Sequence, residues 1–410
     1  MDGAEPAFRA MSPAEAGDRA IGLLTFTTLY PNTSFPNHGV FVENRLRHLL
    51  ASHPVTARVM APVPWFPLAS PRFGTWARHA RVPGRETRHG IVADHPRYLA
   101  IPRLGMSAAP FLLYRAAARA LARMRGEGFA CDLIDAHYLY PDGVAAVWLG
   151  RRFGLPVVIT ARGSDVTQLP GHAIPRRLIQ GAIAGADGLI SVSAALKDGL
   201  VALGAPAEKV TVLRNGVDTA LFHPDGREAA RETLGLTHPT LLSVGHLIAR
   251  KGHHLVIAAL ASLPGTDLLI VGEGPERARL EADIARLGLA GRVRLLGARP
   301  HGELQPLYAA ADALVLASSR EGWANVLLEA MACGTPVVAS RIPGNPEVVQ
   351  RREAGLIVEE NTAAGIAQAV RGLFAAPPAR AATRAYAEAF GWDPTSAGQY
   401  ALFRGLLRRA

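Results

Sequence analysis

The stretch SSREGWANVLLEAMACGTPVVAS, residues 318–340, decides the fold class. The apolar run ALVLA (313–317) precedes it and the run PVVAS ends it, and both are typical of strands that are buried on two faces. Between them we expect a helix from Asn325, a good N-cap residue, to Cys333, because Gly334 favours a helix end. Strand, helix and strand in this order indicate a parallel sheet with helices on its faces.

The same alternation of short apolar runs and longer amphipathic runs extends over both halves of the 410-residue chain. It predicts an α/β fold of two doubly wound, Rossmann-like domains, with a seam near the Asn-Gly turn and loop at 203–226. We expect a flexible tail over 1–20, domains over 21–205 and 206–385, and a terminal amphipathic helix over 386–410 that packs back on the N-terminal domain. The predicted strands are Ile21–Thr27, Ala57–Ala61, Leu133–Ala136, Val157–Thr160, Gly188–Val192, Val210–Arg214, Thr240–Val244, Leu268–Val271, Val293–Leu296, Ala313–Leu316 and Val337–Ala339.

The composition predicts a cytoplasmic protein. Hydrophobic residues make up 49% of the chain, enough for a large core. The two cysteines, Cys131 and Cys333, argue against a disulfide scaffold and fit a reducing compartment. The polar N-terminus has no apolar segment typical of a signal peptide, and no apolar run approaches the roughly 18 residues that span a bilayer. Attachment to the inner membrane face as a peripheral protein stays compatible with this pattern.

The net charge of +10 is concentrated in one region. Residues 51–125 hold 12 arginines but only two acidic residues, Glu86 and Asp94, and the segment PRFGTWARHARVPGRETRHG (71–90) mixes arginines with Phe73 and Trp76. Such a segment suits an anionic partner, such as a membrane surface, a phosphorylated lipid or nucleic acid. The alternative is a solvated arginine-rich face. We expect no nucleic acid, because the arginines belong to no recognisable nucleic-acid motif.

Two carboxylates stand out in the stretch 318–340. Glu321 follows a strand, at the edge where ligands bind in such sheets, and Glu329 lies one turn inside the apolar predicted helix, on the order of 10 Å away. The helix start between them favours an anion, above all a phosphate. The segment could therefore hold a sugar nucleotide, with Glu321 on sugar hydroxyls and Glu329 on the ribose diol. The alternative is an internal salt bridge from Glu329 to an arginine, with Glu321 on the surface. The backbone groups expected near the phosphates belong to Gly322, Asn325, Val326 and Leu327.

This stretch resembles the Glu-X7-Glu signature of the retaining glycosyltransferases of family 4, which have the GT-B fold. The resemblance extends along nearly the whole chain. It implies two Rossmann-like domains facing a central cleft, with the acceptor on the N-terminal domain and the nucleotide-sugar donor on the C-terminal domain. It also implies transfer with retention by front-face displacement. Within the family the chain resembles members from exopolysaccharide or teichuronic-acid loci, which implies a lipid-linked or oligosaccharide acceptor in polysaccharide biosynthesis.

Cationic residues follow another predicted strand, in LLSVGHLIARKGHHLVIAAL (241–260). Positive charge at the carboxyl end of a strand suits a leaving pyrophosphate. The segment is similar to the family's Gly-Arg…Lys-Gly loop, whose Arg and Lys bind the donor phosphates. Lys251 matches the Lys, whereas His246 stands where an Arg is usual, and Arg250 could compensate. Exposed loop charges without a role are the alternative.

Further site residues come from the resemblance. His137 matches the N-domain histidine that contacts the transferred sugar, and Gly39 matches a glycine of the loop that approaches the donor. Gly272 and Gly274 match the loop near base and ribose. Arg162 stands where the family has a His, facing an acceptor or paired with Asp165. The sequence assigns no role to three residues at other matching positions, Glu347, His301 and Tyr308.

No Asp-X-Asp motif and no Cys/His cluster with metal spacing occurs in the sequence, so we expect no divalent ion and no cofactor besides the donor substrate. The sequence leaves two alternatives to the transferase. A nucleotide-sugar 2-epimerase of GT-B-like fold would convert the donor without an acceptor. A non-catalytic binder of anionic ligands would do no chemistry at all.

Overall fold

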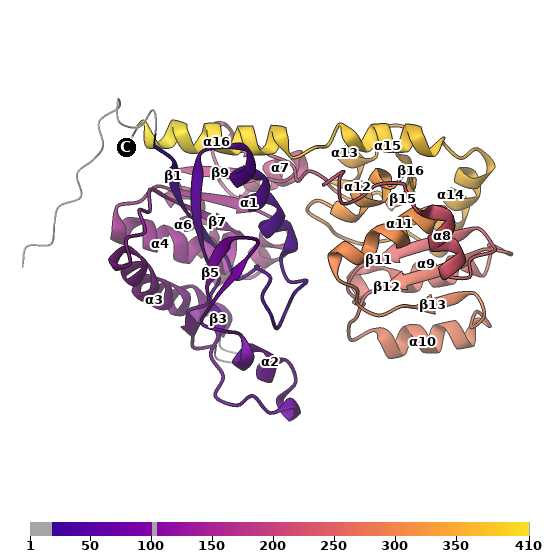
Figure 1. The fold of residues 1–410 in the computed structure, drawn as a ribbon, viewed down its shortest axis with the longest axis horizontal. Helices are drawn as coiled ribbons and strands as arrows, with labels where there is room; N and C mark the ends of the chain where they lie inside the picture. The colour runs from indigo at the N-terminus through magenta and orange to yellow at the C-terminus, as the bar shows by residue number, and fades with distance from the viewer. Residues whose placement is uncertain (1–18, 101–104, 410) are drawn as a thin grey trace, which may run out of the picture. The chain divides into compact units, whose positions relative to one another are not determined.

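The computed structural model describes residues 19–100 and 105–409, so most of the predicted tail lies outside the described residues. The chain forms two compact units (Figure 1). Unit 1 comprises the chain up to Ser191, the segment Gly199–Leu213 and the C-terminal part from Ser396, whereas unit 2 comprises Val192–Asp198 and Arg214–Thr395. Each unit contains one large, mainly parallel sheet, which confirms the prediction of two doubly wound α/β domains.

The sheet of unit 1 has eight strands in the order β10-β9-β8-β7-β1-β2-β5-β4, and only the β4–β5 pair at one edge is antiparallel. Its central strands are buried on both faces, as the apolar runs predicted. Helices α1 and α16 share an apolar cluster with strands of this sheet. Helices α3, α4 and α6 pack against one another. The strands are β1 (Ile21–Phe26), β2 (Val55–Met60), β4 (Arg85–Arg88), β5 (Ile91–Asp94), β7 (Leu133–His137), β8 (Val157–Ala161), β9 (Gly188–Ser191) and β10 (Val210–Val212). The helices are α1 (Val40–Ser52), α3 (Gly105–Gly126), α4 (Val144–Phe153), α5 (Ser164–Thr167), α6 (Ala173–Gly185), α7 (Ala194–Ala202, which begins in unit 2) and α16 (Asp393–Leu407).

A small substructure extends from unit 1 below its main sheet in Figure 1. It consists of the two-stranded parallel sheet β3 (Val63–Pro64) and β6 (Arg97–Tyr98) with helix α2 (Thr75–Arg81). Helix α2 carries Trp76, Arg78 and Arg81 of the arginine-rich segment 71–90, whereas Arg85 and Arg88 of that segment lie on β4 of the main sheet.

The sheet of unit 2 has six strands, all parallel, in the order β13-β12-β11-β14-β15-β16. Helices α9, α10 and α14 share its main apolar cluster, while α8, α11, α12 and α15 pack against one another. The strands are β11 (Thr240–Val244), β12 (Asp267–Val271), β13 (Val293–Leu295), β14 (Ala313–Leu316), β15 (Val337–Ser340) and β16 (Gly355–Val358). The helices are α8 (Arg227–Thr233), α9 (His253–Leu260), α10 (Arg277–Arg286), α11 (Gln305–Ala310), α12 (Asn325–Ala332), α13 (Asn345–Val348), α14 (Ala363–Ala375) and α15 (Arg380–Glu388).

Each sheet has a point at which the strand order reverses. In unit 1 the neighbours β1 and β7 are far apart in sequence, and in unit 2 so are β11 and β14. The loops that leave such strands diverge to opposite faces of the sheet, and ligands of doubly wound folds bind where they separate. The loops concerned are 27–39 and 138–143 in unit 1, and 245–252 and 317–324 in unit 2.

Helix α12 begins at Asn325 and ends at Ala332, with Cys333 as C-cap and Gly334 in the left-handed conformation (φ 74°). The predicted end is therefore correct to within one residue. The predicted cap is wrong, because Ala324 occupies the N-cap position. The side-chain carbonyl of Asn325 accepts a hydrogen bond from the side-chain amide of Asn215 (3.2 Å) instead of capping the helix.

Candidate active site

The loops after β11 and β14 bring Lys251 and Glu321 together in unit 2. Lys251 Nζ donates a hydrogen bond to Glu321 Oε1 over 2.7 Å, and both side chains are largely buried. Burial acts to raise the pKa of Glu321, but the charge and hydrogen bond of Lys251 outweigh it, so the pKa is lowered and the carboxylate stays ionised. The switch point of this sheet thus holds a fixed ion pair, and Glu321 is not a freely solvated surface residue.

The other two predicted phosphate-binding side chains are less firmly held. Arg250 donates to the carbonyl oxygen of Arg320 over 2.8 Å and lies 3.5 Å from Glu321 Oε2, with about a third of its side chain exposed. His246 is exposed on the same loop. The structure therefore places Lys251, Arg250 and Glu321 in one cluster.

Glu329 on α12 is buried and has two intramolecular partners. His301 Nε2 lies 2.9 Å from Glu329 Oε1, and the Tyr308 hydroxyl donates to Oε2 over 2.7 Å. Burial acts to lower the pKa of His301, but the hydrogen bond and charge of Glu329 outweigh it, so that pKa is raised. The partners of Glu329 within the protein are therefore a histidine and a tyrosine, not the arginine considered from the sequence, and its contact with a ribose diol stays a prediction.

Gly272 and Gly274, predicted to lie near the base and ribose, each lie close to a backbone carbonyl oxygen, which leaves no room for a larger side chain. A Cβ on Gly272 would stand 1.9 Å from the carbonyl oxygen of Gly245, and one on Gly274 would stand 2.4 Å from that of Leu247. The loops after β11 and β12 are also joined by hydrogen bonds, from Leu247 N to Glu273 O and from Glu276 N to Leu247 O, both 3.0 Å long. The glycines allow this backbone contact, and contact with a donor stays a prediction.

Helix α12 begins four residues after Glu321, and its first turn holds some of the predicted backbone donors. The amide of Leu327 already donates to the carbonyl oxygen of Ala324 over 3.0 Å. Trp323 anchors the preceding turn, since its indole N–H donates to the carbonyl oxygen of Asn215 over 3.1 Å. The phosphate contacts of Gly322, Asn325 and Val326 stay predictions.

In unit 1, His137 lies at the end of β7 with both ring nitrogens engaged. Arg162 donates to Nδ1 over 2.8 Å, and Nε2 lies 3.3 Å from Asp135 Oδ2. Because an arginine can only donate, the ring proton belongs on Nε2, facing Asp135. Burial lowers the pKa of His137 to about 4, which keeps the ring neutral. A contact of His137 with a sugar stays a prediction.

A buried polar network extends from His137 to the terminal helix. Gln399 on α16 donates to Asp135 Oδ2 over 2.9 Å and accepts a hydrogen bond of the same length from Arg45 Nε. Burial lowers the pKa of Arg45 to about 10. The terminal helix thus contributes directly to the surroundings of the predicted sugar-contacting histidine.

Two aspartates fix the loops at the switch point of unit 1. Asp142 accepts hydrogen bonds from the amide (2.6 Å) and the hydroxyl (3.0 Å) of Thr28, and burial raises its pKa to about 7. Asp165 accepts the backbone amides of Leu139 (2.9 Å), Gly163 (2.7 Å) and Arg162 (3.1 Å). The sequence suggested neither role, because the contacts of Asp142 with Thr28 and of Asp165 with Leu139 join loops that are distant in the chain.

Gly39 precedes α1 at φ 74°, and a Cβ there would stand 2.3 Å from the carbonyl oxygen of Leu29. Only glycine fits this close turn without a backbone shift, so its predicted approach to a phosphate is not needed to explain it.

Glu347, which received no role from the sequence, caps helix α7. Its carboxylate accepts the amides of Ala194 (2.9 Å) and Ala195 (3.0 Å) and pairs with Arg214 over 2.7 Å. A carboxylate at a helix start is stabilised by the exposed amides and by the helix dipole.

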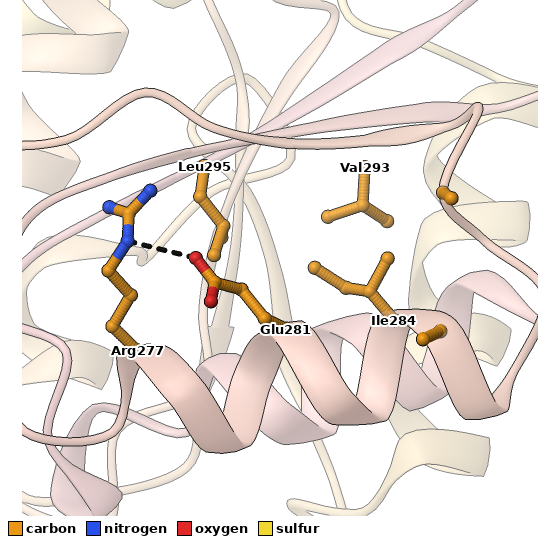
Figure 2. Close-up of a pocket in the computed structure, with 7 residues that line it drawn as sticks. Arg277, Glu281, Ile284, Val293 and Leu295 are labelled. Carbon is orange, nitrogen blue, oxygen red and sulfur yellow. Dashed lines mark ion pairs between the residues drawn. The ribbon is translucent and has the colours of Figure 1, made fainter.

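A separate hollow of about 320 Å³ lies between α10 and the edge strand β13 (Figure 2). The side chains of Ile284, Val293 and Leu295 line it, and the ion pair of Arg277 with Glu281 (2.9 Å) borders it. It contains none of the predicted site residues. Over residues 19–100 and 105–409, no group of three or more His, Cys, Asp or Glu residues could hold a metal ion.

Comparison with known proteins identifies the family. A model described as glycosyl transferases group 1 matches residues 226–390, and a model of glycosyltransferase family 4 matches residues 47–221. A D-inositol 3-phosphate glycosyltransferase of Catenulispora acidiphila is 33% identical over 304 residues, covering 67% of this chain and 72% of the relative. One from Mycobacterium avium is 32% identical over 301 residues, covering 68% and 70%.

Solved structures share the fold. Sucrose-phosphate synthase from Thermosynechococcus elongatus aligns with a TM-score of 0.78 at 23% identity, over 96% of this chain and 100% of that chain. HepE from Anabaena, solved in complex with UDP-glucose, aligns with a TM-score of 0.69 at 21% identity, over 92% and 97%. The chain belongs to the retaining glycosyltransferases of family 4 and has the GT-B fold. It is a glycosyltransferase that takes its sugar from a nucleotide-sugar donor, which argues against the epimerase and the non-catalytic binder.

Proposed function

We propose that unit 2 binds the donor at its switch point and that Lys251 is the main cation for the leaving diphosphate. The Lys251–Glu321 ion pair carries this proposal. An ammonium group has three N–H donors, of which Glu321 takes one and leaves two for phosphate oxygens. Arg250 adds a second positive charge, and Glu321 accepts hydrogen bonds from hydroxyls of the transferred sugar with its remaining lone pairs.

The proposed reaction is front-face displacement, as the family resemblance implies. The bond from the anomeric carbon to the diphosphate oxygen breaks while the acceptor oxygen bonds to the same face of that carbon, and the acceptor proton passes to the departing phosphate. Negative charge grows on the diphosphate as its bond breaks, so a cation already fixed beside it stabilises the transition state more than the ground state. These residues supply that charge without a divalent ion or another cofactor.

Glu329 is proposed to bind the ribose of the donor. Replacing Glu329 by glutamine should weaken the binding of a nucleoside diphosphate by about 10- to 100-fold with the fold intact, because an amide offers only one acceptor oxygen to two hydroxyls. Isothermal titration calorimetry measures the affinity and circular dichroism the fold. Uridine nucleotides are tested first, since HepE of the same fold binds UDP-glucose. Unchanged affinity would contradict the ribose role.

For the acceptor we propose a lipid-linked glycan used in surface or exopolysaccharide assembly, at an anionic membrane surface. Unit 1 exposes four large apolar side chains around the β3–β6 substructure and the start of α3: Trp65 (50%), Leu68 (46%), Leu99 (50%) and Phe111 (51%). Arg72 and Arg115 lie beside aromatic rings in the same region. Exposed apolar side chains among arginines suit a surface of anionic lipid headgroups. No described helix is long and apolar enough to cross a bilayer.

The arginines of this region are less available than their number suggests. Arg85 pairs with Asp94 and Glu127, Arg58 pairs with the same two carboxylates, and Arg88 pairs with Glu43. Glu43 and Glu127 lie outside the segment 51–125 in sequence, so the sequence overstated its free positive charge. The apolar side chains therefore carry more of the membrane proposal than the charge does.

The double replacement Trp65→Ser with Leu99→Ser should weaken binding to anionic phosphatidylglycerol vesicles at low salt by about 10-fold or more, because two large apolar side chains no longer enter the interface. Vesicle co-sedimentation measures the binding. Ile174→Ser, which removes an equally exposed apolar side chain (54%) from α6, is the matched control. The proposal fails if the wild-type protein ignores these vesicles and glycosylates only a soluble acceptor, such as the inositol phosphate that the names of its relatives indicate.

A further inference from the structure

The Glu329 carboxylate is held from two directions by side chains of different elements. His301 belongs to the short 3₁₀ turn His301–Leu304 and Tyr308 to α11, and they lie 28 and 21 residues before Glu329 in the chain. One partner bonds Oε1 and the other bonds Oε2. A glutamate carboxylate otherwise rotates broadly about its last torsion, and here any rotation breaks both hydrogen bonds.

The two partners are themselves fixed by Phe222, which is fully buried. Its ring meets the His301 ring edge-on at 5.1 Å and the Tyr308 ring edge-on at 5.7 Å. Thr335 also donates its hydroxyl to the carbonyl oxygen of Tyr308 over 2.6 Å. The carboxylate is therefore set in place by a rigid cluster, not by two mobile side chains.

We propose that His301 and Tyr308 are positioning residues that hold the Glu329 carboxylate in the orientation needed to accept two neighbouring hydroxyls of the donor's ribose. This inference rests on the proposed function. Each carboxylate oxygen has about two lone-pair sites, and one hydrogen bond to each oxygen leaves one site on each. Two acceptors at fixed separation match the 2′- and 3′-hydroxyls of a ribose, and a deoxygenated ring leaves them unsatisfied.

The test compares UDP with 2′,3′-dideoxy-UDP by isothermal titration calorimetry, with the guanosine and adenosine pairs run in parallel. The wild-type protein should prefer the ribonucleotide by about 100-fold, since loss of two hydroxyls leaves two buried acceptor sites unpaired. Tyr308→Phe should weaken the ribonucleotide about 10-fold and change the affinity for the dideoxynucleotide less than 2-fold. Tyr386→Phe, which removes a hydroxyl that donates to the carbonyl oxygen of Val348 over 2.8 Å, should change neither.

The more exposed partner gives a second pair of variants in case Tyr308→Phe folds poorly. His301→Leu should reduce the preference for ribose in the same way, and His301→Gln, which keeps an N–H donor, should restore part of it. If Tyr308→Phe and His301→Leu weaken both nucleotides equally, the cluster only maintains the fold and the inference is overturned. Nucleotide binding without any preference for ribose also overturns it but leaves the donor site standing, whereas a wild-type protein that binds no nucleoside diphosphate overturns the proposed function as well.

Discussion

Replacing Lys251 by methionine should lower kcat for sugar transfer by about 10²- to 10³-fold, the usual effect of removing a group that stabilises developing negative charge. Methionine keeps the length and most of the volume of the side chain, so the change removes mainly the charge. The Glu321 side chain, only 11% exposed, would lose its closest cation and become a buried carboxylate with a weaker partner. The midpoint of thermal unfolding should therefore fall together with kcat.

The two effects can be separated. In Lys251→Met with Glu321→Gln, the buried negative charge is absent, so recovery of the melting temperature would show that the unpaired Glu321 carboxylate causes the loss of stability. The control is Lys209→Met, which removes another of the three lysines. The ammonium group of Lys209 donates to the carbonyl oxygen of Ile183 (3.1 Å) in unit 1, so its loss should leave kcat unchanged. Turnover by Lys251→Met within about threefold of the wild-type rate would refute the leaving-group role, since such a loss is far below the effect of one electrostatic contact.

That Lys251 and Glu321 each follow a buried strand could be predicted from the sequence, because this depends on rules about parallel sheets. The runs LLSV before His246 and ALVL before Ser318 read as buried strands, and polar residues just after them must gather at the carboxyl edge of the sheet. What the sequence did not give is that β11 and β14 are neighbours. That adjacency turns two separately predicted loops into the direct contact of Lys251 with Glu321.

The surroundings of Glu329 show where such reasoning ends. A buried carboxylate demands a partner, and this much followed from the apolar helix alone. The identity of the partner depends on how α11 and the 3₁₀ turn before it pack against α12, and hydrophobic periodicity carries no information on that packing. With 41 arginines in the chain, an arginine was the natural candidate, yet a histidine and a tyrosine fill the place.

His137 shows the same limit in unit 1. Its place at the end of β7 follows from the sequence, but its neutral state and proton position depend on Asp135 and Arg162. Gln399, which reaches Asp135 from the last helix, is 264 residues away in sequence. No local sequence pattern predicts a polar network between residues so far apart in the chain.

Replacing Gly272 by alanine should destabilise unit 2 by more than about 3 kcal/mol, because the added Cβ cannot be accommodated without moving backbone. The methyl group would stand 1.9 Å from the carbonyl oxygen of Gly245, at a φ of 152° that other residues rarely adopt. Its neighbours are tied on both sides, since Gly245 donates its amide to Val271 O and Gly272 donates its amide to Gly297 O, each over 2.9 Å. Relief of the clash therefore requires these backbone hydrogen bonds of the loops after β11 and β12 to break.

Differential scanning calorimetry measures this effect as a drop of about 6–12 °C in the transition of unit 2. Gly265→Ala is the matched control, because Gly265 also has a positive φ (68°) but nothing lies within 4 Å of the added Cβ. It should cost only the roughly 1–2 kcal/mol of a strained backbone. Equal drops for the two variants would mean that the loops yield easily. A larger drop for Gly272→Ala, accompanied by loss of nucleoside diphosphate binding, would mean that donor binding depends on the backbone contact that this glycine permits.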